Sequence, residues 1–286
     1  MALAFILIAL LIAFLAAGVF MRNPSHARDW LPKHGTQTNV SKNPDGTYVI
    51  HTVRNFTYSR DGAEHQEWVQ NITVDPRRAK RLWYMLEPFT NLEAVAHPYF
   101  IFEFDDGRTQ CFTIEGKRLR NQGYSGIKGL LNAYELGYIW MTEHDCIGMP
   151  LAQQAKALNL YTLELPQEVV RALLEKLLTD TANLFAKPRF YNTLFHNCTT
   201  LFAEAVNSVA PKTLPYDIAW HLPGYSDRYL MKVGLIQTNA SFQNTRKQHN
   251  ILIEKDALWN AITLPEGQCM REVFTLIETK NESRNQ

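Results

Sequence analysis

The most regular pattern of apolar and polar positions in the chain follows Cys198. Apolar residues recur at a helical spacing, at Leu201, Phe202, Ala205, Val206 and Val209. This spacing puts them on one face of an amphipathic helix. Asn197, immediately before, is a residue type that caps helix N-termini. The pattern predicts a helix that begins at Cys198, with the thiol on its inward face.

A second helical stripe lies just upstream. It opens at Pro166, a residue suited to a first helical turn, and ends at Lys187 before a second proline. Its apolar positions are Val170, Leu173, Leu174, Leu177, Leu178 and Phe185. We also expect a short helix near residues 227–233.

Alternating and aromatic runs predict strands elsewhere. Residues 47–53 suit one strand, and residues 97–104 and 109–115 suit a hairpin around the turn Asp105-Asp106-Gly107-Arg108. Residues 134–141 form another apolar element, closed by the polar run 142–145. Residues 75–86 fit either a helix or an extended element. Together these patterns predict an α+β domain with an antiparallel sheet packed on the helix that bears Cys198.

The ends of the chain have a different character. Residues 22–46 are broken by Pro, Gly and Asn and are expected to form a juxtamembrane linker. The domain itself is predicted to span residues 47–238. Residues 239–286 are interpreted as a peripheral C-terminal extension with strand-like pieces and a frayed end.

Residues 2–20 carry no charge. As a helix, nineteen residues rise about 28 Å, close to the hydrocarbon thickness of a bilayer. Residues 1–21 are therefore predicted to be a transmembrane anchor, with a signal peptide as the competing interpretation because residues 15–18 are small. Basic residues after the span favour a cytoplasmic domain by the positive-inside tendency, so charge alone leaves the orientation open.

Charge and cysteine content narrow the function classes. The 29 basic and 28 acidic residues are nearly balanced, which argues against a nucleic-acid-binding protein. The four cysteines show neither disulfide-framework nor zinc-site spacing. Residues 143–145 (Glu-His-Asp) could meet a divalent ion, but three consecutive side chains do not converge, and no phosphate, dinucleotide or metalloprotease motif is present. We expect no metal and no cofactor.

Cys198 is the candidate nucleophile. A thiol at a helix start meets free N–H groups and the positive end of the helix dipole, which favour the thiolate, although a buried structural cysteine is the simpler alternative. His97, at the start of the predicted hairpin, is a better placed base than His196. Glu115 would orient His97 only if the hairpin register puts both on one face: a two-residue turn separates them, and a one-residue bulge unites them.

Several blocks of sequence resemble one family. They are VRNF (53–56), AHPYFIFEFDDG (96–107), IEGKR (114–118), YSGIKGLLNAYELGYIWMTEHD (124–145), PRFYNTLFHNCTT (188–200) and PGYSDRYLMKVGLI (223–236). In this order they resemble the Lnb N-terminal periplasmic domain family of bacterial envelope proteins, over residues 48–238. Gly116 and His196 depart from the usual family blocks, and the additional C-terminal portion of the namesake is missing.

The resemblance implies a permuted papain-like fold whose domain faces the periplasm from the inner membrane. It maps Cys198 to the nucleophile, His97 to the base and Glu115 to an acidic position whose role is less defined. In that scheme the Cys198 N–H, with Asn197 or Tyr191, would steady an oxyanion.

The expected activity is acyl transfer through a Cys-His pair, with N-acyl transfer from a membrane lipid to a lipoprotein amine as the specific form. One rival is a cysteine peptidase or amidase acting on peptidoglycan peptides. The other is a non-catalytic envelope scaffold. The sequence leaves the acyl donor, the acceptor and the oligomeric state open.

Overall fold

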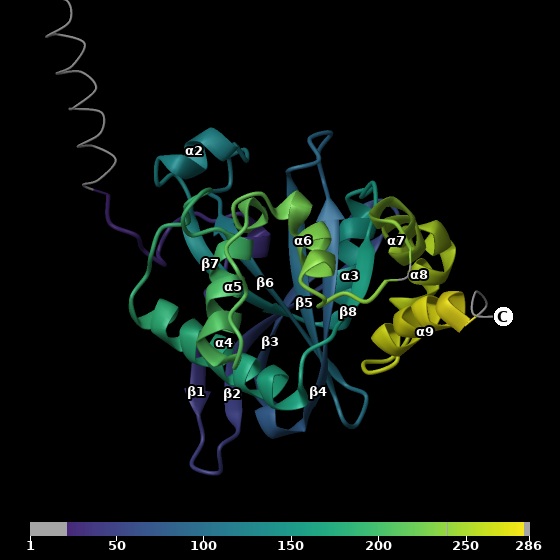
Figure 1. Cartoon of the computed structure of the whole chain (residues 1–286). Coiled ribbons are helices and arrows are strands. Elements are labelled where there is room, and N and C mark those ends of the chain that lie inside the picture. The colour runs from purple at the N-terminus through teal and green to yellow at the C-terminus, as the bar shows by residue number, and fades with distance from the viewer. Residues whose placement is uncertain (1–21, 239, 283–286) are drawn as a thin grey trace, which may run out of the picture.

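The computed structural model describes residues 22–238 and 240–282 and shows one sheet with helices on both faces (Figure 1). The eight strands are β1 (Val40–Lys42), β2 (Tyr48–Ser59), β3 (Gly62–Val74), β4 (Ala79–Pro88), β5 (Ala96–Phe104), β6 (Thr109–Lys117), β7 (Glu135–Met141) and β8 (Asn159–Leu163). Their order is β1-β2-β7-β6-β5-β4-β8, and β3 also pairs with β2. All pairs are antiparallel except β2 with β7, so the sheet is mixed rather than antiparallel throughout.

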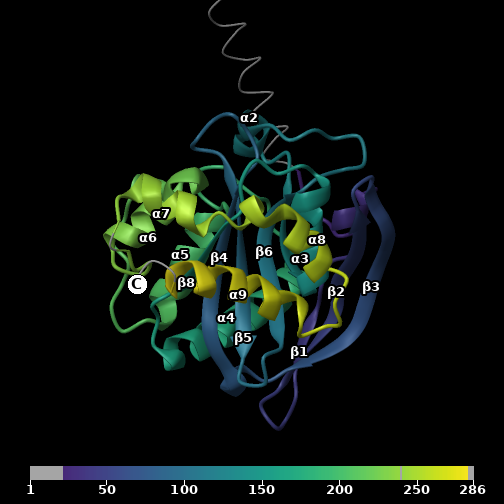
Figure 2. The same cartoon turned by 90° about the vertical axis from the view of Figure 1, so that its right-hand side faces the viewer.

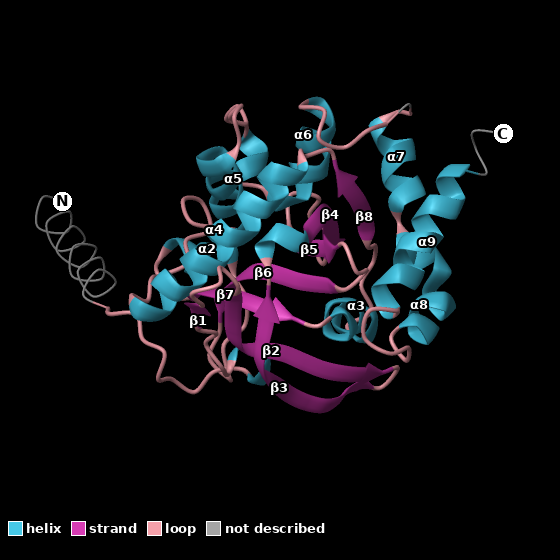
Figure 3. Ribbon diagram, turned by 90° about the horizontal axis from the view of Figure 1, so that it is seen from below, coloured by secondary structure: helices cyan, strands magenta, loops and turns pink. Residues whose placement is uncertain are grey.

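Two hydrophobic cores lie on opposite faces of this sheet. One contains residues of α4 (Gln167–Ala186) and α5 (Cys198–Val209), and the other contains residues of α3 (Glu143–Ala152), α8 (Lys255–Ala261) and α9 (Cys269–Glu282). Figure 2 looks onto α8 and α9, and Figure 3 shows α5 and α9 on different sides of the strands. Phe112 and Ile114 of β6 join the α5 core, whereas Cys111 joins the α9 core.

The strong local patterns correspond to observed elements. The helix α5 begins at Cys198 with Asn197 as its N-cap, and α4 begins directly after Pro166. The short helix α6 spans Ser226–Lys232, and the hairpin is formed by β5 and β6. The ambiguous segment 75–86 is extended for most of its length, as β4, after a single 3-10 turn η2 (Pro76–Arg78).

The C-terminal region is wrongly predicted as strand-like and peripheral. It forms α7 (Phe242–His249), a 3-10 turn η5 (Ile251–Glu254), α8 and α9. Met270, Val273 and Ile277 are buried against the sheet, at a spacing that suits one face of a helix. The polar run 142–145 follows the end of β7, as expected, and it also begins α3, which Thr142 caps.

The segment expected as a linker packs on the sheet. Trp30 and His34 are buried, His34 ends the 3-10 turn η1 (Pro32–His34), and β1 pairs with β2. The predicted transmembrane anchor, residues 1–21, lies outside the described residues. Across residues 22–238 and 240–282, no helix combines the length and the apolar character needed to span a bilayer.

Candidate active site around Cys198 and Glu115

Cys198 occupies the first position of α5 and is almost completely buried. The Asn197 side-chain oxygen accepts hydrogen bonds from the N–H groups of Thr199 and Thr200, each at 2.9 Å. This cap satisfies two of the free donors of the first turn. The thiol is in turn approached by its own N–H and by the N–H and hydroxyl of Thr199.

Burial outweighs the helix start in setting the acidity of the thiol. It raises the pKa of Cys198 to about 12, although the Thr199 and Cys198 N–H groups lower it. The expectation of a stabilised thiolate is therefore wrong for the resting protein. The thiol is protonated at neutral pH, so any nucleophilic step requires a base to remove its proton.

His97 and Glu115 lie on one face of the sheet. The β5–β6 register pairs Phe100 with Phe112, because a three-residue turn, 105–107, replaces the two-residue turn considered from sequence. Continued in the same register, position 97 faces position 115. The His97 Nε2 lies 3.7 Å from Glu115 Oε1.

The hydrogen bonds of His97 define its tautomer. The Thr113 hydroxyl donates its only proton to the Pro98 carbonyl, at 2.8 Å. It must therefore accept from His97 Nε2, 3.0 Å away, so that Nε2 carries the imidazole proton. Among the described residues Nδ1 has no hydrogen-bond partner, which leaves its lone pair free to accept a proton. Burial lowers the pKa of His97 to about 4, against the opposing charge of Glu115, so the ring is neutral.

Glu115 is the centre of a buried ionic cluster that includes two residues of the η1 turn. Lys33 Nζ lies 3.3 Å from Glu115 Oε2, and His34 Nε2 lies 2.7 Å from the same oxygen. Burial alone would raise the pKa of Glu115, but Lys33 and His34 outweigh it and hold that pKa well below its usual range. Glu115 is therefore an anion, and its Oε1 is buried without a hydrogen-bond partner among the described residues.

A buried arginine supports the same cluster from β2. Arg54 donates to both carboxylate oxygens of Asp145 on α3, at 2.8 and 3.0 Å, and its Nη1 lies 3.7 Å from Glu115 Oε1. Both partners of this pair are fully buried. The VRNF and EHD blocks of the sequence thus meet in one ion pair, which fixes α3 against β2.

Cys198 and His97 belong to different faces of the sheet. Cys198 packs in the core with α4 and α5. The alternation of β5 puts His97 on the side of Tyr99, in the α9 core. Between the described side chains of Cys198 and His97 there is no hydrogen bond. Glu115 is close enough to raise the pKa of Cys198 further, which shows that the thiol and the cluster share one end of the sheet.

The two side chains predicted to steady an oxyanion are otherwise engaged. The Asn197 oxygen caps α5, and its nitrogen donates to the Thr193 carbonyl at 2.9 Å. Tyr191 is buried and shares a side-chain hydrogen bond with Tyr124. A Cys198 thiolate would raise the pKa of Tyr191, after the larger effect of burial, so this ring is near the thiol.

A group of three residues that could hold a metal ion is distant from Cys198 in the sequence. It combines two of the consecutive residues 143–145 with a cysteine from the C-terminal region. Ligand atoms of Glu143, His144 and Cys269 lie within 4.8 Å of one another. The Glu143 carboxylate already accepts from the Gly267 N–H at 2.7 Å and from the Thr109 hydroxyl at 2.9 Å. Since these donors hold the carboxylate, we assign the group a structural role in seating α9.

Residues 42–224 match the Lnb N-terminal periplasmic domain family. The chain belongs to this family. No significant match was found among curated proteins or among solved structures.

The Lnb N-terminal domain match includes Cys198, His97 and Glu115, but two residues of the cluster lie outside it. Lys33 and His34 precede position 42, where the family match begins. Sequence reasoning missed both, since they lie in a proline- and glycine-broken segment without periodicity. The match also ends before α8 and α9, whose residues belong to the core on one face of the sheet.

Glu87 on β4 is a further buried group that sequence reasoning did not find. It pairs with His97 across the β4–β5 ladder and accepts a hydrogen bond from the Tyr99 hydroxyl at 2.9 Å. Burial raises the pKa of Glu87 to about 7, although the Tyr99 bond and Lys33 lower it. His97 therefore stands between one ionised carboxylate and one carboxyl that titrates near neutrality.

Proposed function

We propose that this chain is a membrane-anchored periplasmic thiol enzyme that transfers acyl groups, with Cys198 as nucleophile, His97 as base and Glu115 as the group that supports the base. One observation carries the proposal. A capped helix start directs N–H groups at the Cys198 thiol, at the same end of the sheet as a histidine whose Nδ1 lone pair is unused. The permuted papain-like arrangement suggested by the family resemblance belongs to the same proposal.

The chemistry balances in two steps. The Cys198 sulfur attacks the ester carbonyl of a phospholipid, so that a C–S bond forms and the C–O bond breaks. The thiol proton passes through His97 Nδ1 to the departing lysophospholipid alcohol. An amine of a lipoprotein then attacks the thioester, so that a C–N bond forms, the C–S bond breaks and the amine proton returns to the Cys198 thiolate. The Cys198 and Thr199 N–H groups are the donors nearest the developing oxyanion.

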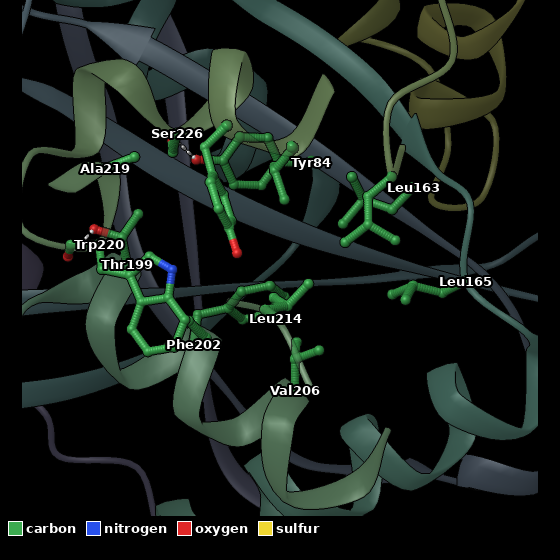
Figure 4. A pocket seen from close by; sticks show the side chains of 14 residues that line it. Tyr84, Leu163, Leu165, Thr199, Phe202, Val206, Leu214, Ala219, Trp220 and Ser226 are labelled. Carbon is green, nitrogen blue, oxygen red and sulfur yellow. Dashed lines mark hydrogen bonds between the residues drawn. The ribbon is translucent and has the colours of Figure 1, made fainter. Parts of the chain in front are cut away.

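The surroundings of α5 favour an apolar donor. A cavity of about 30 Å³ lies beside Thr199 and is lined almost entirely by carbon, with Phe202, Val206 and Leu214 in its wall (Figure 4). This is about the volume of one water molecule in the liquid, so an acyl chain enters only if the wall residues move. An apolar wall beside Thr199, the residue that follows the proposed nucleophile, suits a lipid chain better than a peptide.

The scaffold alternative has one observation in its favour. It predicts no hydrogen bond between Cys198 and a histidine, and the described residues contain none. Catalytic hydrogen bonds are often long before substrate binds, but side chains on opposite faces of the sheet exchange a proton only if His97 or the start of α5 moves, so the transferase requires such a movement. The acyltransferase and the scaffold differ in whether Cys198 becomes acylated.

The deciding experiment traps the acyl-enzyme. The full chain, in detergent with a phospholipid carrying a labelled acyl chain, is expected to gain the acyl mass on the peptide with Cys198, measured by mass spectrometry. Cys198→Ala should abolish this gain and His97→Ala should strongly reduce it. Cys269→Ala, a buried thiol at another site, is the matched control. Equal acylation of wild type and Cys198→Ala would exclude the mechanism, and turnover of peptidoglycan peptides alone would favour the amidase.

A further inference from the structure

Large apolar side chains are exposed together at one end of the molecule. Ile127 of α2 (Gly126–Leu130) is 73% exposed, Phe195 is 64% exposed and Tyr216 is 71% exposed. Tyr124 and Ile218 are also exposed, and we call these five residues the apolar end. Contiguous exposed apolar surface of this kind marks an interaction site in a folded protein.

Hydrogen bonds show that the segments bearing the apolar end are adjacent. The Thr193 hydroxyl donates to the Gly126 carbonyl of α2 at 2.9 Å, which joins α2 to the loop with Phe195. On the other side of this loop, His221 bonds to the Leu194 carbonyl. The His221 ring also forms a hydrogen bond with the Tyr216 hydroxyl at 2.7 Å. The segment before η3 (Ile218–Trp220) is therefore adjacent to the same loop.

The apolar end surrounds the start of α5. Phe195 precedes Cys198 by three residues, and the Asn197 cap bonds to Thr193 in the same loop. Tyr124 shares a hydrogen bond with Tyr191, the ring near the thiol. A partner seated on the apolar end would therefore lie directly over the approach to Cys198.

The described chain begins at this same end. Asp29 accepts from the Arg120 N–H at 2.9 Å, and Trp30 forms a bridge with Leu119 in the loop that leads to α2. In Figure 1 this start of the chain runs toward the top of the view, where α2 also lies. The sequence immediately before Arg22 is the uncharged stretch 2–20, long enough to cross a bilayer.

Exposed cations border the apolar end. Arg22 and Lys128 are exposed in this region, and Arg120 is exposed as well but pairs with Asp29 at 3.1 Å. Aromatic and aliphatic side chains framed by basic residues match the interface of an anionic bilayer, where rings lie at head-group level and cations meet phosphate. The chain is nearly neutral overall, so a second copy carries no net negative charge that would attract these cations.

We propose that the apolar end docks onto the surface of an anionic phospholipid bilayer, with Ile127 and Phe195 inserted at head-group depth and the start of α5 facing the lipid. The bilayer is the one in which residues 1–21 would be anchored. This docking rests on the proposed anchoring and not on the thiol chemistry, so a catalytically inert Cys198 would leave it intact.

The test measures depth in the membrane. The full chain is reconstituted into vesicles of phosphatidylethanolamine and phosphatidylglycerol, with a fluorophore on Ile127→Cys, Phe195→Cys or Ile253→Cys. The native cysteines are buried, and Ile253 is an exposed apolar control in η5. Lipids brominated near the head group should quench most of the fluorescence at 127 and 195 and none at 253. Equal, weak quenching at all three positions would overturn the proposal.

Two further measurements keep the proposal falsifiable. A label on Ile218→Cys should lose its quenching when Ile127→Asp and Phe195→Asp are combined, and should keep it with Ile253→Asp. If nitroxides at 127 and 195 instead show strong spin–spin coupling in lipid-free detergent, the apolar end is an interface between copies and the proposal fails. The depth profile should be unchanged in Cys198→Ala, which separates this test from that of the acyl transfer.

Discussion

His34 donates from Nε2 to Glu115 Oε2 across 2.7 Å, although 81 residues separate them in the chain. The backbone N–H of Arg118 donates to His34 Nδ1 at 3.0 Å, so Nδ1 must be the acceptor and Nε2 must carry the proton. Burial lowers the pKa of His34 to about 4, in agreement with a neutral ring. A single tautomer therefore links the N-terminal segment to the carboxylate beside His97.

The first prediction follows from this bond. His34→Ala removes a buried donor to an anion and leaves a cavity, so we expect the free energy of unfolding to fall by about 2–4 kcal/mol. Denaturant unfolding measures this change. His65→Ala, on the exposed part of β3, is the control and should change little. A fall no larger than the control's would mean that the η1 turn does not contribute to the folded domain.

The second prediction concerns a buried ion pair. Asp145→Asn leaves the Arg54 charge without its carboxylate, which is expected to cost about 3–5 kcal/mol of the free energy of unfolding. Asp256→Asn removes the partner of Arg60, an exposed pair at 2.7 Å that should contribute almost nothing. Thermal and denaturant unfolding of both variants checks the difference. Similar unfolding free energies for Asp145→Asn and Asp256→Asn would show that the Arg54–Asp145 pair does not stabilise the fold.

The third prediction is a pH dependence set by two histidines. Burial lowers the pKa of His34 and His97 to about 4, whereas the ordinary value is 6.5. Between these values the unfolded chain binds more protons than the folded chain, so the free energy of unfolding should rise with pH from about 4 to about 6.5. His97 is about 18% exposed, so its share is smaller than that of His34.

Glu87 has the opposite effect on the pH dependence of the free energy of unfolding. Burial raises its pKa from 4.5 to about 7, so the folded chain holds a proton that the unfolded chain has released. Its stabilising effect is complete below about pH 4.5 and is lost as the pH rises through about 7. Glu87→Gln should therefore steepen the rise in unfolding free energy between pH 4.5 and 6.5, measured by urea unfolding. Glu64→Gln, exposed on β3, should leave the slope as in wild type; a matching slope in Glu87→Gln would refute the assignment.

The fourth prediction concerns the packing of Tyr191 on β6. A Cβ added at Gly116 would lie 3.2 Å from Tyr134 Cβ and 3.3 Å from Tyr191 Cγ, tighter than ordinary contact. Gly116→Ala should displace the Tyr191 ring and cost about 1–3 kcal/mol of stability. Alkylation of Cys198 should become faster as the ring moves. Gly123→Ala, with open space around it, should affect neither stability nor alkylation.

Local patterns were sufficient for the elements that carry the proposed nucleophile and base. The helix at Cys198 was predictable because its cap and apolar stripe lie within twelve residues of one another, and the β5–β6 hairpin because its turn and strands are contiguous. The register of this hairpin was not predictable, since it depends on a three-residue turn, 105–107, in which Gly107 adopts a φ of 83°. One residue of register decides which face Glu115 occupies.

Contacts between residues distant in the sequence explain why part of the site could not be predicted. Lys33 and His34 contact Glu115 only in the folded sheet. No residue spacing within 22–46 predicts this contact. The helix α9 is a different case, because Met270, Val273, Phe274 and Ile277 have a helical spacing from which a helix can be predicted. The roles assigned to Cys198, His97 and Glu115 remain predictions that acyl trapping tests.

The docking of Trp30 limits how far the domain can travel. Eight residues, from Arg22 to Asp29, separate this fixed side chain from the apolar stretch, and fully extended they reach at most about 29 Å. If that stretch is held in a membrane, the domain samples only a thin layer above it. Its encounters then become a two-dimensional search, in which substrates confined to the same leaflet meet it far more often than molecules diffusing through the periplasm.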